Sequence, residues 1–191
     1  NVEACAIERA REIIAMSATD VEQFTSRLNA HERNRHGQHC CGGEMELLLE
    51  PLPPRPTVAI FGVGHVGFEL ARILSRLEVR LHLIDSRAEQ LNELRLAAIT
   101  DGPALVQVHR VLLGEGVLEQ LPPGSHVRIM THDHAEDFAL CDAAVRRTDL
   151  GSVGVIGSRA KWSRFSSMLT EAGHSKAEIA RISCPIGRTS P

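Results

Sequence analysis

Three glycines near the start of the chain's middle third have the spacing of a phosphate-binding turn. Gly62, Gly64 and Gly67 follow the apolar residues 58–61 in the order G-x-G-x-x-G, with His65 inside the turn. The first glycine of such a turn permits the tight bend, the second lets a phosphate approach the backbone, and the third lets the helix lie close to the strand. The phosphate then meets free N–H groups and the positive end of the helix dipole. The motif predicts a nucleotide or another phosphorylated ligand, although the glycines also suit a vestigial turn.

An acidic residue follows the glycines at the distance expected for a nucleotide site. Asp85 ends the next apolar stretch, eighteen residues beyond Gly67, where a carboxylate can bond ribose hydroxyls. Its negative charge favours a ligand with an unphosphorylated 2′-hydroxyl, whereas the neighbouring Arg87 weakens that preference.

Two more polar clusters follow apolar stretches, and both are expected at the edge of the sheet where ligands bind. One is Thr131, His132, Asp133 and His134. The two imidazoles lie two residues apart, on one side of an extended segment, with Asp133 opposite them or acting as a helix N-cap. They suit a pocket wall or general acid/base work more than zinc, because no third protein ligand is visible. The other cluster is Gly157, Ser158 and Arg159, which indicates either an anion clamp or a solvated helix start.

The cysteines offer a second kind of chemistry. Cys40 and Cys41 precede two glycines, so a thiol there is expected on an accessible turn, where a thiolate holds a soft metal or a persulfide. Cys184, followed by a proline, is a further candidate, whereas Cys5 and Cys141 fall on helices and suit packing. The five cysteines have no framework spacing, which favours a reducing compartment and a cytoplasmic protein.

Composition narrows the function classes. The 191 residues carry a formal charge of −3 with the basic residues dispersed, which argues against nucleic acid as a partner. No apolar run reaches the roughly 18 to 20 residues that span a bilayer, so no membrane association is expected. There is no tyrosine, which excludes mechanisms that use a phenolic acid or base. The chain opens inside a predicted helix, which indicates either a fragment of a longer protein or a partly ordered chain.

The pattern of apolar residues predicts an α/β fold, a Rossmann-like doubly wound parallel sheet preceded by part of a small N-terminal α+β module. A helix is predicted over 3–16 and a strand over 45–49, while 21–28 fits either. A proline-rich linker at 51–56 separates residues 1–50 from a Rossmann-like domain at 57–191. In that domain the predicted strands are 57–61, 80–84, 105–108, 127–131 and 153–156, and the predicted helices are 66–76, 88–96, 135–146 and 161–172.

Taken together and in order, several motifs resemble the XdhC/CoxI family, accessory proteins of xanthine dehydrogenase and related molybdenum hydroxylases. They are Cys41-Gly42-Gly43, residues 46–52, the glycine turn, the Thr131 cluster, the Gly157 cluster with Lys161, and Cys184-Pro185-Ile186-Gly187. The resemblance implies a strand at 21–28 and makes residues 1–50 part of that family's N-terminal module.

The resemblance also implies a function and assigns roles. Such a protein binds molybdenum cofactor (molybdopterin), protects it while a cysteine desulfurase supplies sulfur to the metal, and passes it to the apo-hydroxylase. It would be a chaperone rather than a catalyst, and we expect a homo-oligomer. Cys41, or its neighbour Cys40, is the candidate contact for molybdenum or its sulfur. The glycines, Ser158 and Arg159 become candidates for the phosphate or nucleotide. The full set of candidate cofactor-binding residues is Cys40, Cys41, Gly62, Gly64, His65, Gly67, Asp85, Thr131, His132, Asp133, His134, Gly157, Ser158 and Arg159.

Two alternatives stay open. One is an oxidoreductase that uses NAD, with His132 or His134 as proton donor, although residues 1–50 are few for a substrate domain. The other is a nucleotide-sensing regulatory domain without chemistry.

Overall fold

The computed structural model describes residues 2–16, 20–27, 44–52 and 54–186. The chain divides into two compact units, Asn1–Pro54 and Arg55–Pro191. The boundary falls within the proline-rich segment at 51–56, and the two units are described separately.

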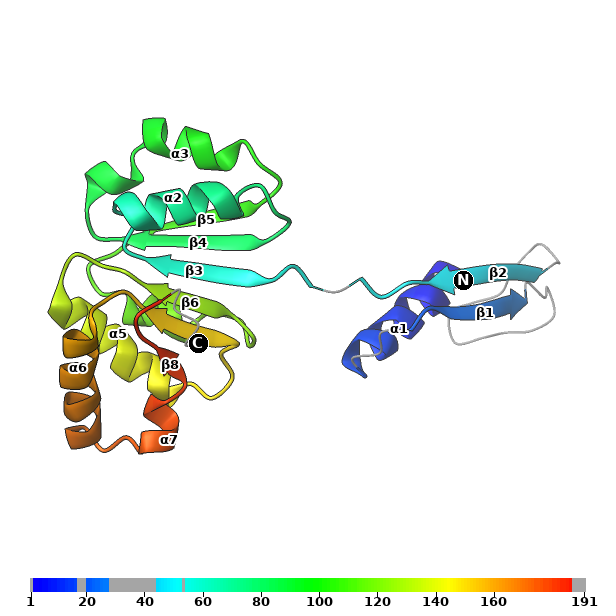
Figure 1. Ribbon diagram of the computed structural model, residues 1–191. Coiled ribbons are helices and arrows are strands. Elements are labelled where there is room, and N and C mark those ends of the chain that lie inside the picture. The colour runs from blue at the N-terminus through cyan, green and yellow to red at the C-terminus, as the bar shows by residue number, and fades with distance from the viewer. Residues whose placement is uncertain (1, 17–19, 28–43, 53, 187–191) are drawn as a thin grey trace, which may run out of the picture. The chain divides into compact units, whose positions relative to one another are not determined.

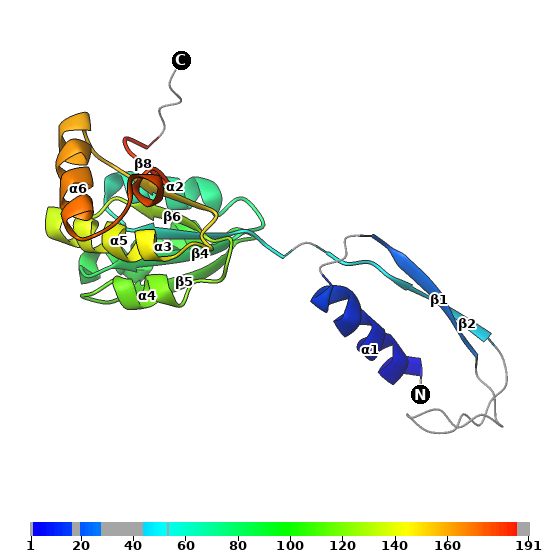
Figure 2. The same cartoon turned by 90° about the horizontal axis from the view of Figure 1, so that it is seen from below.

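The first unit contains one helix and a two-stranded antiparallel sheet. Helix α1 (Val2–Ala15) lies along the hairpin formed by β1 (Glu22–Arg27) and β2 (Glu44–Leu49), as Figure 2 shows. Ile13 is its buried apolar side chain, and Arg9 on the helix donates to Glu22 on β1 (Nε–Oε1, 2.5 Å). The ambiguous segment 21–28 therefore contains a strand, Glu22–Arg27, as the family resemblance implied.

The second unit is built on a six-stranded parallel sheet with the order β5-β4-β3-β6-β7-β8 (Figure 1). The predicted Rossmann-like fold is confirmed. The order reverses between β3 and β6, so the loops after these two strands diverge and leave room for a ligand. The strands are β3 (Thr57–Phe61), β4 (Arg80–Asp85), β5 (Leu105–Arg110), β6 (His126–Ile129), β7 (Ser152–Val155) and β8 (Ile182–Ser183).

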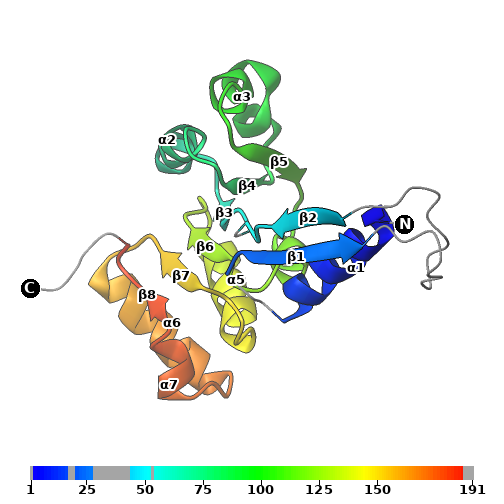
Figure 3. The ribbon, with the colours of Figure 1, turned by 90° about the vertical axis from the view of Figure 1, so that its right-hand side faces the viewer.

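Helices cover both faces of this sheet (Figure 3). Along β3, Val58 and Ile60 pack into one core and Ala59 and Phe61 into the other, because successive side chains of a strand point to opposite faces. The first core is covered by α2 (His65–Leu74), the 3-10 turn η1 (Ala88–Leu91) and α3 (Glu93–Thr100). The second is covered by α4 (Glu115–Glu119), α5 (His134–Arg146), α6 (Arg159–Glu171) and α7 (Lys176–Ile179).

The predicted elements agree with the structure to within about two residues at most ends, with one exception. The predicted helix 88–96 is wrong, because the chain forms the short turn η1 and then starts α3 afresh. Asn92 caps α3, its side-chain oxygen accepting from the backbone N–H of Arg95 (3.0 Å). The short elements α4, α7 and β8 were not predicted. Among the described residues, no helix has both the length and the apolar character to cross a bilayer.

Candidate ligand-binding crevice

The glycine turn joins β3 to α2 at the point where the strand order reverses. Gly62 has φ +96°, and a Cβ on it would lie 2.3 Å from the carbonyl oxygen of Met130 beside β6. A Cβ on Gly67 would lie 2.0 Å from the carbonyl oxygen of Gly62, so this glycine lets α2 approach β3. Both positions therefore require glycine for the chain's own packing.

Gly64 differs from the other two glycines because a Cβ there would clash with no described residue and make one ordinary contact. The nearest atom to a Cβ placed there is Nη2 of Arg87, at 3.8 Å. Gly64 is also the N-cap of α2, and no side chain caps that helix. The N–H groups of the first turn of a helix have no partners within the helix, and here an arginine lies beside them. This is the arrangement that binds a phosphate group.

Asp85 is predicted to bond a ribose, but its carboxylate already accepts hydrogen bonds from other residues of the chain. It is 3% exposed, and its Oδ2 accepts from the backbone N–H of Val63 (2.7 Å) and from Nη2 of Arg87 (2.8 Å). Its Oδ1 accepts from the backbone N–H (3.0 Å) and Nε (2.9 Å) of Arg87. Burial alone would raise the pKa of Asp85, but these hydrogen bonds outweigh it and hold the pKa below its ordinary value. Asp85 thus fixes the guanidinium of Arg87 beside Gly64, and that guanidinium in turn neutralises the carboxylate charge that would repel a 2′-phosphate.

The Thr131 cluster follows β6, across the switch point from the glycine turn. Asp133 is the N-cap of α5, and its Oδ1 accepts from the backbone N–H groups of Ala135 (2.7 Å) and Glu136 (3.0 Å). These bonds lower the pKa of Asp133. Of the two roles predicted for Asp133, helix N-cap is confirmed.

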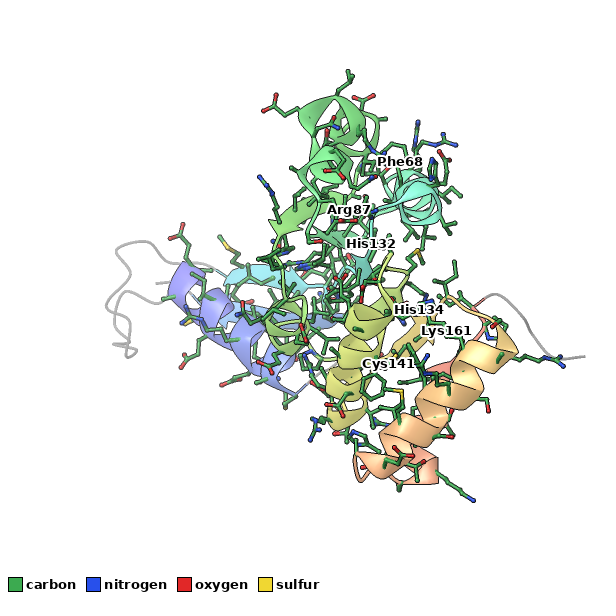
Figure 4. All side chains as sticks on the ribbon, turned by 90° about the vertical axis from the view of Figure 1, so that its left-hand side faces the viewer. Phe68, Arg87, His132, His134, Cys141 and Lys161 are labelled. Carbon is green, nitrogen blue, oxygen red and sulfur yellow. The ribbon has the colours of Figure 1, made fainter. Side chains whose placement is uncertain are left out.

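His132 and His134 are exposed, and they lie at the edge of the sheet where the parallel strands have their carboxyl ends. This edge faces the viewer in Figure 4. In that view Arg87 and His132 lie near the centre, and His134 and Lys161 lie farther along, towards α6. No group of three or more His, Cys, Asp or Glu side chains within the described ranges is arranged to hold a metal ion. The histidines line the edge as polar groups able to donate to an anion.

The Gly157 cluster follows β7. The hydroxyl of Ser158 caps α6 by accepting from the backbone N–H of Lys161 (3.2 Å). A Cβ on Gly157 would lie 2.7 Å from Cδ of Lys161, so Gly157 gives the lysine chain room to cross. Arg159 begins α6 and is exposed. Of the three predicted residues, Arg159 is thus the one whose polar side chain is free of a capping role.

An ion pair that the sequence analysis missed connects the segment after β6 to the segment after β7. The ammonium of Lys161 pairs with Oδ2 of Asp137, which is 1% exposed, and donates to the carbonyl oxygen of Ile156 (3.0 Å). The other oxygen of Asp137 accepts from the backbone N–H (3.1 Å) and hydroxyl (2.7 Å) of Thr131. The segments after β6 and β7 are thereby held against each other. Nothing in the sequence distinguishes Asp137 from the other acidic residues of that helical turn.

Glu136 is a second residue that the sequence analysis did not select. It is half-buried on the first turn of α5, and burial raises its pKa, as does the nearby charge of Asp85, while His132 acts in the opposite direction. The negative charge of Glu136 also contributes to raising the pKa of Arg87. Glu136 is therefore close enough to Asp85 and Arg87 to interact with their charges.

The described thiols have different environments. Cys141 is fully enclosed in the core, and burial raises its pKa to about 12, which confirms a packing role. Cys184 is half-buried, with its sulfur 3.5 Å from the Cβ position of Gly157, and burial raises its pKa while Lys161 opposes the shift. Cys40 and Cys41 lie outside the described residues.

Comparison with known proteins gives a family and a fold. The family model of the XdhC Rossmann domain matches residues 58–190. Among solved structures, a protein from Bacillus halodurans named as a xanthine dehydrogenase superimposes with a TM-score of 0.54 at 15% sequence identity. The match covers 94% of this chain and 56% of that one, so the chain spans little more than half of that protein's length. At this identity the likeness concerns the fold alone. None of the curated proteins matches.

Proposed function

The chain belongs to the XdhC family, and from this premise we propose that it is an accessory protein that carries molybdenum cofactor to xanthine dehydrogenase or a related molybdenum hydroxylase. The cofactor is cargo rather than a resident group. It is held while a cysteine desulfurase supplies the terminal sulfur of the metal, and is then passed to the apo-enzyme. We place this exchange in the cytoplasm and expect the protein to act as a homo-oligomer.

The observation that carries the proposal is the open glycine at the switch point. Molybdopterin ends in a phosphate group, and the position beside Gly64 combines free backbone N–H groups with the guanidinium of Arg87. A phosphate there would accept from the first turn of α2 and from Arg87. Arg159, exposed on the same edge of the sheet, is a further candidate for the nucleotide that some forms of the cofactor carry.

The polar groups of the crevice are engaged in holding its loops, which suits binding rather than turnover. Asp85 anchors Arg87, Asp133 caps α5, and Asp137 holds Lys161. A rigid edge built in this way presents a preformed surface to a ligand and reduces the ordering cost of binding.

The thiol pair keeps its proposed role at the metal end of the cargo. A thiolate at Cys41 or Cys40 would contact molybdenum or its sulfur. Replacing both cysteines by serine should weaken retention of the cofactor, and unchanged retention in the double variant would remove this assignment.

The experiment compares two glycine variants. The protein is mixed with released molybdenum cofactor under reducing, anaerobic conditions, separated by gel filtration, and assayed for its ability to activate apo-xanthine dehydrogenase. Gly64→Val places a branched side chain where the phosphate would approach, at a position with φ −67° that any residue tolerates. Gly116→Ala, with open space around its Cβ on α4, is the matched control. The proposal predicts retention and transfer by the wild type and the control, and loss of both in Gly64→Val. Failure of the wild type to retain cofactor would refute it.

A nicotinamide-dependent oxidoreductase is the second candidate, favoured by the strand order and the glycine turn. The occupied carboxylate of Asp85 weighs against it, because a ribose would have to displace Arg87 or Val63. Titration with NADH, followed by cofactor fluorescence, separates the two. Saturable binding that Gly64→Val abolishes would favour the oxidoreductase.

A further inference from the structure

A groove separate from the glycine turn lies between α5 and α6. Its volume is about 610 Å³, within the range of small-molecule sites. None of the three motif glycines lines it. The lining residues are His134, Ala135, Phe138, Ser158, Ala160, Lys161, Arg164, Phe165 and Met168.

Two aromatic rings and a thioether form the apolar part of the groove. Phe138 on α5 meets Phe165 on α6 edge to face, with ring centroids 5.6 Å apart and an interplanar angle of 78°. Phe165 is 3% exposed, whereas Phe138 and Met168 remain half-buried at the groove. Aromatic rings and methionine sulfur favour contact with a flat, polarizable ring.

The polar part of the groove is positive. The Nζ atom of Lys161 lies 5.3 Å from the ring centroid of Phe165, and its charge is balanced by Asp137. Arg164 is exposed and forms no ion pair with any carboxylate in the described part of the chain, and His134 is exposed at the mouth. None of the described lining residues is acidic. An anionic group in the groove would therefore meet Arg164 without a competing carboxylate.

From these features we propose that the α5–α6 groove binds a planar heteroaromatic ring that carries an anionic group. This inference rests on the proposed function, in which the ring is the pterin portion of the molybdenum cofactor. The groove would thus be a subsite distinct from the phosphate position at Gly64. The ring contacts Phe138 and Met168, and Arg164 pairs with an anionic group of the ligand other than the phosphate that we place at Gly64.

The test uses pterin-6-carboxylate, a fluorescent pterin with one carboxylate, titrated against the whole chain. Binding should saturate, and unsubstituted pterin should bind more weakly because it lacks the anion. Arg164→Glu should weaken binding of the carboxylate by about tenfold or more, the size of one lost charge-assisted hydrogen bond. Arg76→Glu, an exposed arginine just after α2 on the opposite face of the sheet, is the matched control and should leave the affinity unchanged.

Three results would overturn the inference. The first is the absence of saturable binding up to about 1 mM, because such an affinity is too weak for a built site. The second is equal weakening of binding by both arginine variants, and the third is equal binding of the two pterins. Phe138→Leu provides an independent variant, because it keeps an apolar side chain but removes the aromatic contact, and it too should weaken binding. If the groove instead takes an acidic peptide of a partner protein, the pterins will not bind and the inference fails.

Cofactor retention separates this failure from failure of the proposed function. Wild type and Arg164→Glu are each loaded with molybdenum cofactor anaerobically. Equal retention by both would exclude the groove while the proposed function stands. Loss of retention in Arg164→Glu, with retention by Arg76→Glu, would support both proposals. Retention by none of the proteins would refute the proposed function itself.

Discussion

Replacing Asp137 by asparagine would remove the charge that balances Lys161 while preserving the size of the side chain. Asp137 is 1% exposed and Lys161 is 12% exposed, so the lysine ammonium would lose its paired carboxylate in a largely enclosed place. It would retain one acceptor, the carbonyl oxygen of Ile156 at 3.0 Å. The asparagine oxygen could still accept from Thr131.

The expected cost follows from these surroundings. Removing one partner of a buried ion pair destabilises a protein by about 3 to 5 kcal/mol. Because Ile156 and Thr131 keep hydrogen-bonding partners, we expect the lower end, about 3 kcal/mol. For a unit of about 140 residues this corresponds to a fall of about 10 °C in melting temperature.

The assay is urea unfolding followed by tryptophan fluorescence. Trp162 is the chain's one tryptophan and lies on α6 next to Lys161, so the signal reports on the second unit alone. Asp149→Asn is the matched control, because its carboxylate pairs with Arg147 (2.6 Å) at 42% exposure and should cost less than about 1 kcal/mol.

A double-mutant cycle decides whether the pair is responsible. Lys161→Met with Asp137→Asn removes the isolated charge, so the double variant should recover much of the loss. If Asp137→Asn stays within about 1 kcal/mol of the wild type, or the two changes simply add, the reasoning about this pair is wrong.

Three further predictions concern the glycine turn and two titrating groups. Gly62→Ala should destabilise the second unit severely, because φ is +96° and the new Cβ would clash with Met130, whereas Gly64→Ala should leave the melting temperature within about 2 °C of wild type. Burial and the neighbouring His109 lower the pKa of His82 to about 4, below its ordinary 6.5. As pH falls from 6.5 to 4, the unfolded chain therefore takes up a proton on His82 before the folded chain does, and up to about 3 kcal/mol of stability is lost over this range. The variant His82→Gln should not show this loss in urea titrations at several pH values. The raised pKa of Glu136 has the opposite sign, so stability falls as pH rises from 4.5 through the folded-state pKa, and Glu136→Gln should stabilise the protein at pH 7 and not below pH 4.5.

Each of these has a contrary result. Equal melting of the two glycine variants would show that the space around Gly62 and Gly64 does not differ as described. If the stability of His82→Gln and of the wild type changed with pH in the same way, the folded chain would not be lowering the pKa of His82. A gain from Glu136→Gln that persists below pH 4.5 would mean that charge is not its cause.

The fold was predictable because its main signals are local. The strand at 58–61, the three glycines and the amphipathic stretch after them specify a strand, a turn and a helix within a few residues. The elements that the sequence analysis missed, α4, α7 and β8, are very short and depend on tertiary packing more than on propensity. The break before α3 depends on one cap, Asn92.

The site was less predictable because the spacing of residues in the sequence does not determine which donor forms a hydrogen bond with a given acceptor. Asp85 has the spacing of a ribose ligand, yet Arg87, two residues later, folds back onto it. Asp137 is one of several acids on a helix, and its importance depends on Lys161, which is distant in sequence and lies on another helix, α6. Thus the sequence could indicate the edge of the sheet where ligands bind, but the partners of each charge depend on the tertiary structure.

The central claim is that this protein holds molybdenum cofactor as cargo at the switch-point crevice. Elemental analysis tests it most directly, on wild type and Gly64→Val purified without oxygen from a host that makes the cofactor. We predict molybdenum in stoichiometric amount with the wild type and a small fraction of it with the folded variant. Equal molybdenum in both, or none in the wild type, would contradict the account.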